Sequence, residues 1–239
     1  MIPKIIHYCW FGRNPKSKLI EKCIDSWEKF CPDWQIIEWN EDNYDVTQNE
    51  FCRQAYANKK WAFVSDYARF DILYRMGGIY MDTDVEVIQS LEPFLKHDVF
   101  AGHETDEWVA PGLILGSVPK HPIMRQVLEA YQNASFMNDD GSENHKTVGE
   151  FFTAALKETG IELNGAYQEK NGVAIYPKEY FCPLDDSTGV MSKTSNTYTI
   201  HWYSKTWISP AIKWRTKITR PLHRIFGVDC FEKIKRIIK

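Results

Sequence analysis

The clearest chemical signal in the sequence is a pair of aspartates, Asp82 and Asp84, with one residue between them. They lie in segment 79–88, where apolar and acidic residues alternate, as in a β-strand whose side chains point to opposite faces in turn. On such a strand the two carboxylates share a face, about 7 Å apart, because each residue rises about 3.3 Å. Like charges at that separation repel unless water or a cation lies between them. The pair therefore predicts a site for a divalent cation.

The preferred cation in turn indicates a class of ligand. Oxygen ligands suit Mg²⁺ or Mn²⁺, and Mg²⁺ usually takes only one or two protein carboxylates, completing its shell with water and phosphate oxygens. A phosphate-bearing ligand is therefore expected. Three alternatives remain for the motif alone: a solvated acidic strand edge, a phosphohydrolase of the haloacid dehalogenase type, and a non-catalytic carbohydrate-binding domain. The phosphohydrolase class usually places its D-x-D on an early strand, and a carbohydrate-binding domain would not need the cation.

The elements that must position this pair alternate between strand and helix patterns. Residues 4–10 and 34–39 are short apolar runs rich in β-formers, whereas residues 17–30 carry apolar side chains at helical spacing. Helical spacing returns over residues 60–76, and the Gly-Gly pair that follows supplies a stop. Strand, helix and strand in succession indicate a parallel crossover. We expect an α/β domain whose N-terminal half is mainly parallel.

The second half of the chain has weaker patterns of the same kind. They predict strands at 99–103, 112–116, 173–176 and 197–202, and helices at 122–131 and 147–157. The polar stretch 133–145 is expected to be a loop.

Four segments taken together resemble one known family. They run from Ile2 to Trp10, from Trp61 to Arg69, from Gly77 to Asp84 and from His201 to Trp207. In this order they are similar to the D-x-D sugar-binding glycosyltransferases related to yeast initiating α-1,6-mannosyltransferases, to bacterial capsular-polysaccharide transferases and, distantly, to clostridial glucosylating toxins. The resemblance implies a GT-A fold, a Rossmann-like mixed sheet flanked by helices. It also implies a nucleotide-sugar donor, Mn²⁺ or Mg²⁺, and transfer with retention of anomeric configuration.

The resemblance assigns roles to residues at the donor end. Trp10 matches an aromatic that stacks on the donor base, although a core aromatic is the alternative. Asp66 matches a carboxylate that contacts sugar or ribose hydroxyls, and Arg69 matches the guanidinium beside it, which can fork onto phosphate oxygens. By spacing alone, Asp66 and Arg69 are a modest ion pair one helical turn apart. Asp66, Arg69, Asp82 and Asp84 are thus the expected catalytic set.

Further residues are implied at the edges of the donor site. Three are candidates for contact with the nucleotide: Tyr8, Asn40 and Tyr80. A buried strand tyrosine is the alternative for Tyr80, and a simple turn residue is the favoured alternative for Asn40. A neutral His201 could complete the metal shell with Asp82 and Asp84 or contact the diphosphate, and a satisfied histidine at a strand end is the alternative. The loop that closes over the donor in the family is matched by Trp202, Ser204 and Trp207, for which packing on the core is the competing interpretation.

The acceptor end departs from the family pattern. Pro111 stands where relatives commonly carry an asparagine near the sugar, so no contact is predicted there. Glu104, Asp106 and Glu107 precede this loop and could face an acceptor or form an ordinary acidic surface loop. No side chain is identified as a covalent nucleophile. The implied reaction is hexose transfer from a UDP- or GDP-sugar to a glycan or lipid-linked saccharide, in polysaccharide biosynthesis.

Bulk composition limits the other classes. The chain has 239 residues, 44% hydrophobic and 26% charged, which suits one packed domain. A net charge of −3 and a pI near 6.2 give no overall attraction to nucleic acid. Six cysteines form no C-x-x-C pair, and the N-terminus has no signal-peptide pattern. Free thiols in a reducing cytoplasm are expected, and no apolar run is long enough to span a membrane.

The C-terminal tail is expected to differ from the rest. We predict a transferase domain over 1–210 and a basic amphipathic extension over 211–239. Within the extension, apolar residues of 231–238 share one side of a predicted helix, and the remaining residues are mostly basic. Such a helix could lie on an anionic membrane, at the inner face of the cell membrane, where it would bring the enzyme to a lipid-linked acceptor. Docking on the domain is the alternative.

Overall fold

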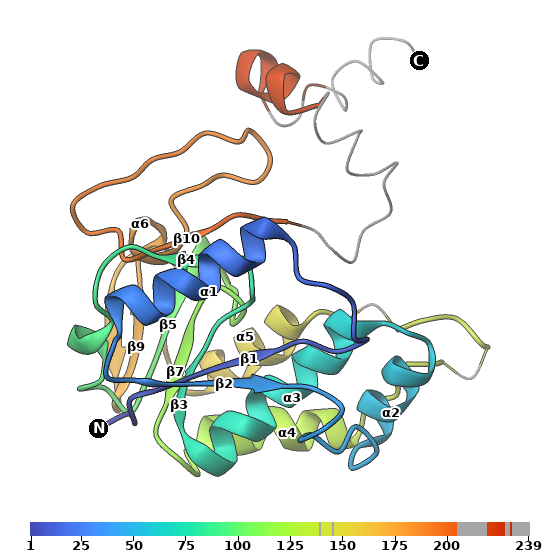
Figure 1. Cartoon of the computed structure of the whole chain (residues 1–239). Coiled ribbons are helices and arrows are strands. Elements are labelled where there is room, and N and C mark those ends of the chain that lie inside the picture. Colours follow the sequence, from blue (N-terminus) through green and yellow to red (C-terminus); the bar gives the residue numbers. More distant parts are fainter. Residues whose placement is uncertain (139, 145, 205–218, 228–229, 231–239) are drawn as a thin grey trace.

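A central mixed β-sheet organises the chain in the computed structural model, which describes residues 1–138, 140–144, 146–204, 219–227 and 230 (Figure 1). Within these residues the strand order is β2-β1-β3-β7-β5-β9-β8, with β6 paired to β5. The strands are β1 (Ile5–Cys9), β2 (Gln35–Trp39), β3 (Gly78–Tyr80), β5 (Val99–Thr105), β6 (Trp108–Val109), β7 (Leu115–Ser117), β8 (Gln168–Lys170) and β9 (Val173–Tyr176).

Strand direction determines which strand ends meet. β1 pairs in parallel with β2 and β3, and β5 pairs in parallel with β9. β7 lies antiparallel between β3 and β5, so β3 and β5 also run in the same direction. The mainly parallel N-terminal half is therefore confirmed. The carboxyl ends of β1, β3 and β5 lie along one edge of the sheet, the edge at which open α/β sheets bind ligands.

Helices cover both faces of the sheet (Figure 1). One face packs against α2 (Glu50–Ala57), α3 (Trp61–Met76), α4 (Pro122–Gln132) and α5 (Val148–Glu158). The other packs against α1 (Lys18–Phe30), the short 3-10 helix η1 (Glu92–Phe94) and α6 (Lys178–Phe181). Alternate strand residues supply the two cores: Val99 and Ala101 face α3, whereas Phe100 faces the other layer.

Local signals explain where several helices begin. The side chain of Ser17 accepts a hydrogen bond from the backbone N–H of Ile20 and so caps α1. Thr147 and Glu150 form a reciprocal capping box at the start of α5. The predicted helices at 17–30, 60–76, 122–131 and 147–157 are all present, shifted by one or two residues at most. The sequence analysis missed α2, which Asn49 caps through the N–H of Cys52.

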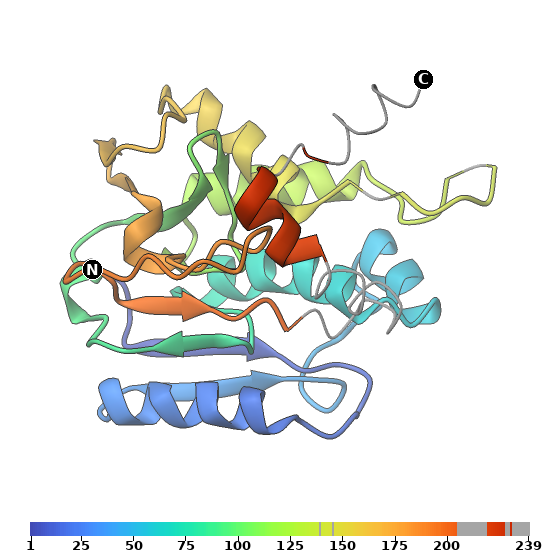
Figure 2. The same cartoon turned by 90° about the horizontal axis from the view of Figure 1, so that it is seen from above.

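The single strand expected over 79–88 is wrong. β3 ends at Tyr80, the chain turns, and β4 (Val85–Val87) leaves the central sheet to pair antiparallel with β10 (Thr199–His201) (Figure 2). The turn is closed by a hydrogen bond from the Val85 N–H to the Asp82 carbonyl, at 3.1 Å. Because helices cover both faces of β3, Tyr80 is buried as deeply as Ile79. The alternation of residue types in this segment therefore does not show which side chains face the core. Asp82 and Asp84 therefore lie in a turn, not on one strand face.

The C-terminal predictions lie mostly outside the described residues. Residues 205–218, 228–229 and 231–239 are not described, so the domain boundary at 210, Trp207 and the predicted final helix are not placed. A described helical segment, 219–226, packs against the loop 185–190. All six cysteines are buried free thiols. In the part of the chain that is described, no helix has both the length and the apolar character needed to cross a bilayer.

A buried histidine joins the first three strands. The Trp39 indole N–H donates to His7 Nδ1 at 3.1 Å, and His7 Nε2–H donates to the Gly77 carbonyl at 2.9 Å. The fit is close, because a Cβ on Gly78 would lie 2.8 Å from His7 Nε2. Desolvation lowers the pKa of His7 to about 4, so the ring is neutral in the folded protein.

This neutral histidine predicts a loss of stability in acid. The folded-state pKa of about 4 lies below the ordinary 6.5, so below pH 6.5 the unfolded chain binds this proton more readily. We expect the His7 contribution to lower the free energy of unfolding by about 2–3 kcal/mol between pH 7 and pH 4.5. Urea denaturation at both pH values measures it. A His7→Gln variant should be less stable at pH 7 and should lose this part of the pH dependence; an unchanged dependence would contradict the account.

Candidate active site

A cavity of about 820 Å³ opens at the carboxyl ends of β1, β3 and β5. Its walls come from Trp10 after β1, the turn 82–84 after β3, Glu104 on β5 and the first half of α3. His201 at the end of β10, with Tyr203 and Ser204 after it, lines one side. A volume of this size accommodates a ligand as large as a nucleotide sugar.

An arginine on α3 bridges two carboxylates from different elements. Arg69 Nη2 donates to Asp66 Oδ1 at 2.7 Å and lies 3.3 Å from Asp82 Oδ1. The guanidinium is 3% exposed and lies over the ring of Tyr80, 4.6 Å from its centroid. Its Nη1 is buried and, within the described residues, has no hydrogen-bond partner. A buried N–H without a partner is costly, so a ligand oxygen is the natural acceptor for it.

Asp66 and Asp82 share the single guanidinium of Arg69, so negative charge exceeds positive charge on this side of the cavity. Desolvation raises the pKa of Asp66 to about 7, because the attraction of Arg69 offsets only part of the burial cost and Asp82 adds repulsion. Burial also raises the pKa of Tyr80 well above 10, so its hydroxyl stays protonated and donates to Asp82 Oδ1 at 3.2 Å. The pair of acidic groups therefore favours a cationic ligand.

Asp84 is held from the segment after β10. His201 Nε2 lies 3.2 Å from Asp84 Oδ1, and the backbone N–H of Ser204 donates to Oδ2 at 2.6 Å. Burial alone would raise the pKa of Asp84, but His201 and the Ser204 N–H hold it well below its usual range. Burial would lower the pKa of His201, and the Asp84 carboxylate raises it above 6.5 instead. Asp84 is thus fixed in its ionised form.

The side chains that line the cavity suit a divalent cation that takes most of its ligands from a bound phosphate compound and only one or two from the protein. Within the described residues, no group of three or more His, Cys, Asp or Glu is arranged to hold a metal. The described lining nevertheless carries one guanidinium, Arg69, against five carboxylates, those of Asp66, Asp82, Asp84, Glu104 and Asp186. A bare diphosphate would be repelled by this charge. A Mg²⁺ or Mn²⁺ ion that used one or two of these carboxylates together with phosphate oxygens would reverse that repulsion.

Most of the residues predicted for the site do line the cavity. They are Trp10, Asp66, Arg69, Tyr80, Asp82, Asp84, His201 and Ser204. Thr83, between the two aspartates, lines it as well. Segments 120 residues apart in the sequence therefore meet at one place, which only the pairing of β4 with β10 explains.

Three predicted residues point elsewhere. The hydroxyl of Tyr8 donates to Glu38 Oε2 at 2.7 Å, and Asn40 Nδ2 donates to Glu38 Oε1 at 3.1 Å. The indole N–H of Trp202 donates to Glu86 Oε2 at 2.8 Å, with Lys22 over its ring. None of these three side chains lines the cavity in this structure, because the strand pleat and the turn at 40–43 direct them away from it.

Other residues reach the cavity without having been predicted. Trp61, Trp108, Asp186 and Tyr203 line it, and no spacing rule singles them out because each belongs to a different element. Glu104 lines it too, whereas its neighbours Asp106 and Glu107 are exposed. Pro111 is buried and does not line the cavity.

Gly112 brings the backbone of a turn against the Asp82 side chain. Its carbonyl accepts from the Asp82 N–H at 2.9 Å, and a Cβ at this position would overlap the Asp82 carboxylate and lie 3.0 Å from Arg69 Nη1. Only glycine allows this approach.

The fold is that of the GT-A glycosyltransferases. The solved structure titled PaToxG Glycosyltransferase superimposes with a TM-score of 0.51 over 66% of this chain and 68% of that one, at 20% identity. Residues 17–101 match the family described as glycosyltransferase sugar-binding region containing DXD motif. The predicted resemblance to the D-x-D sugar transferases is confirmed by this match.

Curated relatives share the same region. The chain is 28% identical over 158 residues to inositol phosphoceramide mannosyltransferase 1 of Schizosaccharomyces pombe, covering 62% of this chain and 47% of the relative. It is 30% identical over 144 residues to mannosyl phosphorylinositol ceramide synthase CSH1 of Saccharomyces cerevisiae, covering 56% and 36%. The chain thus spans less than half the length of these relatives.

The tight approach of Gly112 predicts a selective defect. Gly112→Ala should push the Asp82 carboxylate away from its place beside Arg69. If Asp82 is a metal ligand, as the sequence predicts, Mn²⁺-dependent nucleotide binding should weaken at least about 10-fold. Isothermal titration of UDP and GDP with and without Mn²⁺ measures the loss, and circular dichroism checks that the fold persists. Unchanged Mn²⁺-dependent affinity in a folded variant would contradict the assignment of Asp82.

Proposed function

We propose that this protein is a metal-dependent glycosyltransferase that moves a hexose from a UDP- or GDP-sugar to an acceptor hydroxyl, with retention of anomeric configuration. The observation that carries the proposal is the cavity at the strand ends, where Asp82 and Asp84 meet the Asp66–Arg69 pair. The match of residues 17–101 to the sugar-binding region supports the same conclusion.

The geometry suggests how a donor would bind. Trp10 is half-buried at the end of β1, and its indole N–H donates to the Asn14 carbonyl at 2.7 Å, which fixes the ring at the cavity wall. A fixed indole is a stacking surface for the nucleobase. From there the diphosphate would extend toward Asp82 and Asp84, in the turn that follows the neighbouring strand β3. The unpartnered Nη1 of Arg69 would donate to a phosphate or sugar oxygen.

The bound cation would supply Lewis-acid stabilisation of the diphosphate as it leaves. Asp82 and Asp84 would hold it, with His201 as a third ligand or as the partner that orients Asp84. Arg69 keeps its charge and would stabilise the same phosphate oxygens. Asp66 would accept hydrogen bonds from donor hydroxyls, an interaction that its burial strengthens.

The acceptor is proposed to be a glycan or a lipid-linked saccharide. The notion of polysaccharide synthesis follows from the bacterial members of the family, whereas the names of the yeast relatives favour mannosyl transfer to an inositol-containing sphingolipid. Both acceptors present hydroxyls on a ring. A phosphohydrolase of the haloacid dehalogenase type is disfavoured because that class usually places its D-x-D on an early strand, whereas here β1 and β2 precede the strand that leads into the motif. A carbohydrate-binding domain would not require five carboxylates around one cavity.

A donor screen tests the activity. Wild-type protein with Mn²⁺ should hydrolyse or transfer from at least one of a panel of UDP- and GDP-hexoses, and removal of the metal with EDTA should abolish turnover. Asp84→Ala should lower kcat/KM at least about 100-fold, since a bound metal lowers the activation barrier by several kcal/mol and the variant would lose this stabilisation. Asp25→Ala, an exposed carboxylate on α1, is the matched control and should retain wild-type turnover. Full activity in Asp84→Ala, or no donor bound by wild type, would overturn the proposal.

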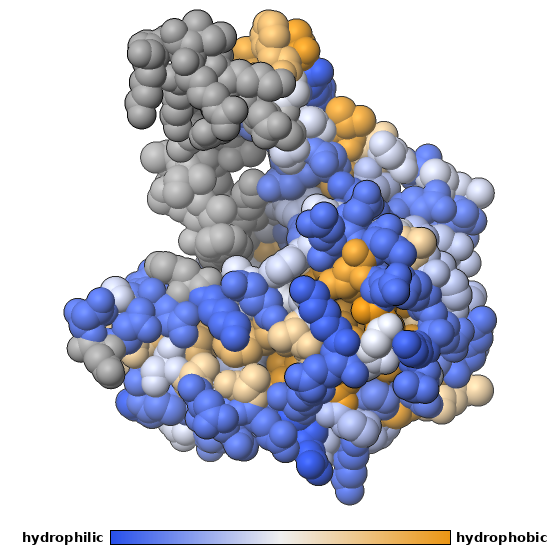
Figure 3. All heavy atoms as spheres, turned by 180° about the vertical axis from the view of Figure 1, so that it is seen from behind, coloured by the Kyte–Doolittle hydropathy of each residue, from blue (hydrophilic) through white to orange (hydrophobic). Residues whose placement is uncertain are grey.

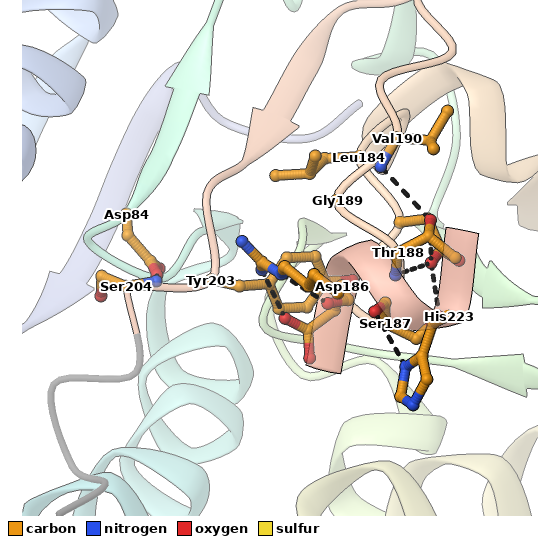
Figure 4. Close-up of polar contacts among 12 residues, drawn as sticks. Asp84, Leu184, Asp186, Ser187, Thr188, Gly189, Val190, Tyr203, Ser204 and His223 are labelled. Carbon is orange, nitrogen blue, oxygen red and sulfur yellow. Dashed lines mark hydrogen bonds and ion pairs between the residues drawn. The ribbon is translucent and has the colours of Figure 1, made fainter. Parts of the chain in front are cut away.

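A membrane surface is proposed as the place of action, at the cytoplasmic face. Ile225 and Phe226 are 72% and 61% exposed on the helical segment 219–226. Figure 3 shows apolar side chains gathered on this segment. The segment is fixed to the loop 185–190 by Arg220, which pairs with Asp186 at 3.0 Å, and by Arg224, which donates to the Thr188 carbonyl. Figure 4 shows His223 of the same segment beside Ser187 of the loop. Since Asp186 lines the cavity, the exposed apolar side chains belong to an element attached to the cavity wall.

Vesicle flotation tests this location. With vesicles containing anionic lipid, the double variant Ile225→Ser, Phe226→Ser should float several-fold less than wild type, because two exposed apolar side chains are lost. Truncation before Lys213 should also reduce flotation. Tyr167→Ser, which removes an aromatic that is 44% exposed elsewhere, is the matched control. Equal flotation of wild type, the double variant and the truncation would rule the membrane out.

A further inference from the structure

Two carboxylates of the described lining, Glu104 and Asp186, take no part in the proposed donor site, and Asp186 pairs with Arg220. Glu104 lies near the end of β5, and its Oε1 accepts a hydrogen bond from the Tyr203 hydroxyl at 2.8 Å. The Cys182 thiol lies behind, 2.9 Å from the same hydroxyl oxygen. Three residues from β5, from the end of α6 and from the segment after β10 thus meet in one chain of contacts.

Burial and hydrogen-bond direction show where the hydrogens lie in this row of contacts. Burial raises the pKa of the Cys182 thiol to about 12, so the thiol keeps its proton. The Tyr203 hydroxyl donates to Glu104 Oε1, and the Cys182 thiol lies against the same hydroxyl oxygen from behind. Within the described residues the second oxygen, Oε2, has no hydrogen-bond partner.

The backbone at Tyr203 is held in a costly conformation. Its φ of +51° lies in the left-handed region, which is unfavourable for a residue other than glycine. The flanking residues maintain it: the Trp202 N–H donates to the Asp84 carbonyl at 3.0 Å, and the Ser204 N–H donates to the Asp84 carboxylate (Figure 4). The Tyr203 ring also lies 4.1 Å from that of His201. One strained turn therefore holds Asp84 and directs Tyr203 to Glu104.

The strand order places Glu104 beyond the metal-binding turn. Along the sheet edge, Trp10 follows β1, Asp82 follows β3, and Glu104 lies on β5, with β7 between β3 and β5. Two strand spacings of about 4.8 Å put β5 about 10 Å from β3, roughly the length of a hexose ring with its substituents. A donor that stacks on Trp10 and binds metal at Asp82 would direct its sugar toward Glu104.

The charge of Glu104 indicates what it binds. A carboxylate repels phosphate, and no described cation lining the cavity pairs with this one. It accepts hydrogen bonds from hydroxyls, and a charged acceptor makes stronger bonds than a neutral one. We propose, on the basis of the function proposed above, that Glu104 is the acceptor-binding residue, holding a ring hydroxyl of a sugar or cyclitol, and that Tyr203 positions it. The segment of the acceptor that carries the attacking hydroxyl is accordingly neutral.

Steady-state kinetics separate this role from a structural one. The probes are methyl α-D-mannoside and myo-inositol as acceptors, with the donor that wild type turns over fastest. Glu104→Gln keeps the shape and loses the charge, so KM for the better acceptor should rise about 10- to 100-fold while KM for the donor stays within about twofold. Tyr203→Phe should raise the acceptor KM less, by about three- to tenfold, because Glu104 remains but is no longer fixed.

Controls distinguish the ways in which the proposal can fail. Glu107→Gln, an exposed carboxylate three residues away, should leave both KM values unchanged. Glu104→Asp should recover part of the acceptor affinity that Glu104→Gln loses. Equal changes in the two KM values, or none, would overturn the role of Glu104 while wild-type turnover upholds the transferase. Wild-type protein that turns over no donor would defeat the transferase, and the acceptor role with it.

Discussion

The guanidinium of Arg69 is the group around which the candidate active site is assembled. It is almost fully buried, and a buried charge is tolerated only when opposite charges and hydrogen bonds surround it. Asp66 from the same helix and Asp82 from the turn after β3 supply those charges, and the Tyr80 ring covers its face. Helix α3 is thereby fixed to the end of β3. The position of the first aspartate of the motif depends on this contact.

The second aspartate depends on a different part of the chain. Asp84 begins the two-stranded ribbon of β4 and β10, and residues 201–204 hold its carboxylate in the ionised form. Each member of the motif is therefore fixed by its own set of neighbours, one on α3 and one after β10. Such separate support suits a metal site, because the two carboxylates are held near each other although their charges repel.

The sequence predicted the helices and most strands well, because their cores impose regular spacing on apolar residues. It also predicted cavity-lining polar residues, such as Asp66 and Arg69, in segments that resemble the family. It failed at segment 79–88, where the apolar pattern continued through a turn into a second sheet. It also could not find Tyr203 as a site residue, since the contact with Glu104 joins positions 99 residues apart.

By itself, the sequence determined the class of chemistry. Paired carboxylates, an arginine one helical turn from an aspartate and the alternation of strand and helix are local features, and local spacing is sufficient to reveal them. Only the tertiary structure decided which side chains face the cavity. Tyr8, Asn40 and Trp202 hydrogen-bond outside it, whereas Glu104 and Tyr203 line it. The reason is that facing depends on strand order and crossover contacts, which join residues far apart in the chain.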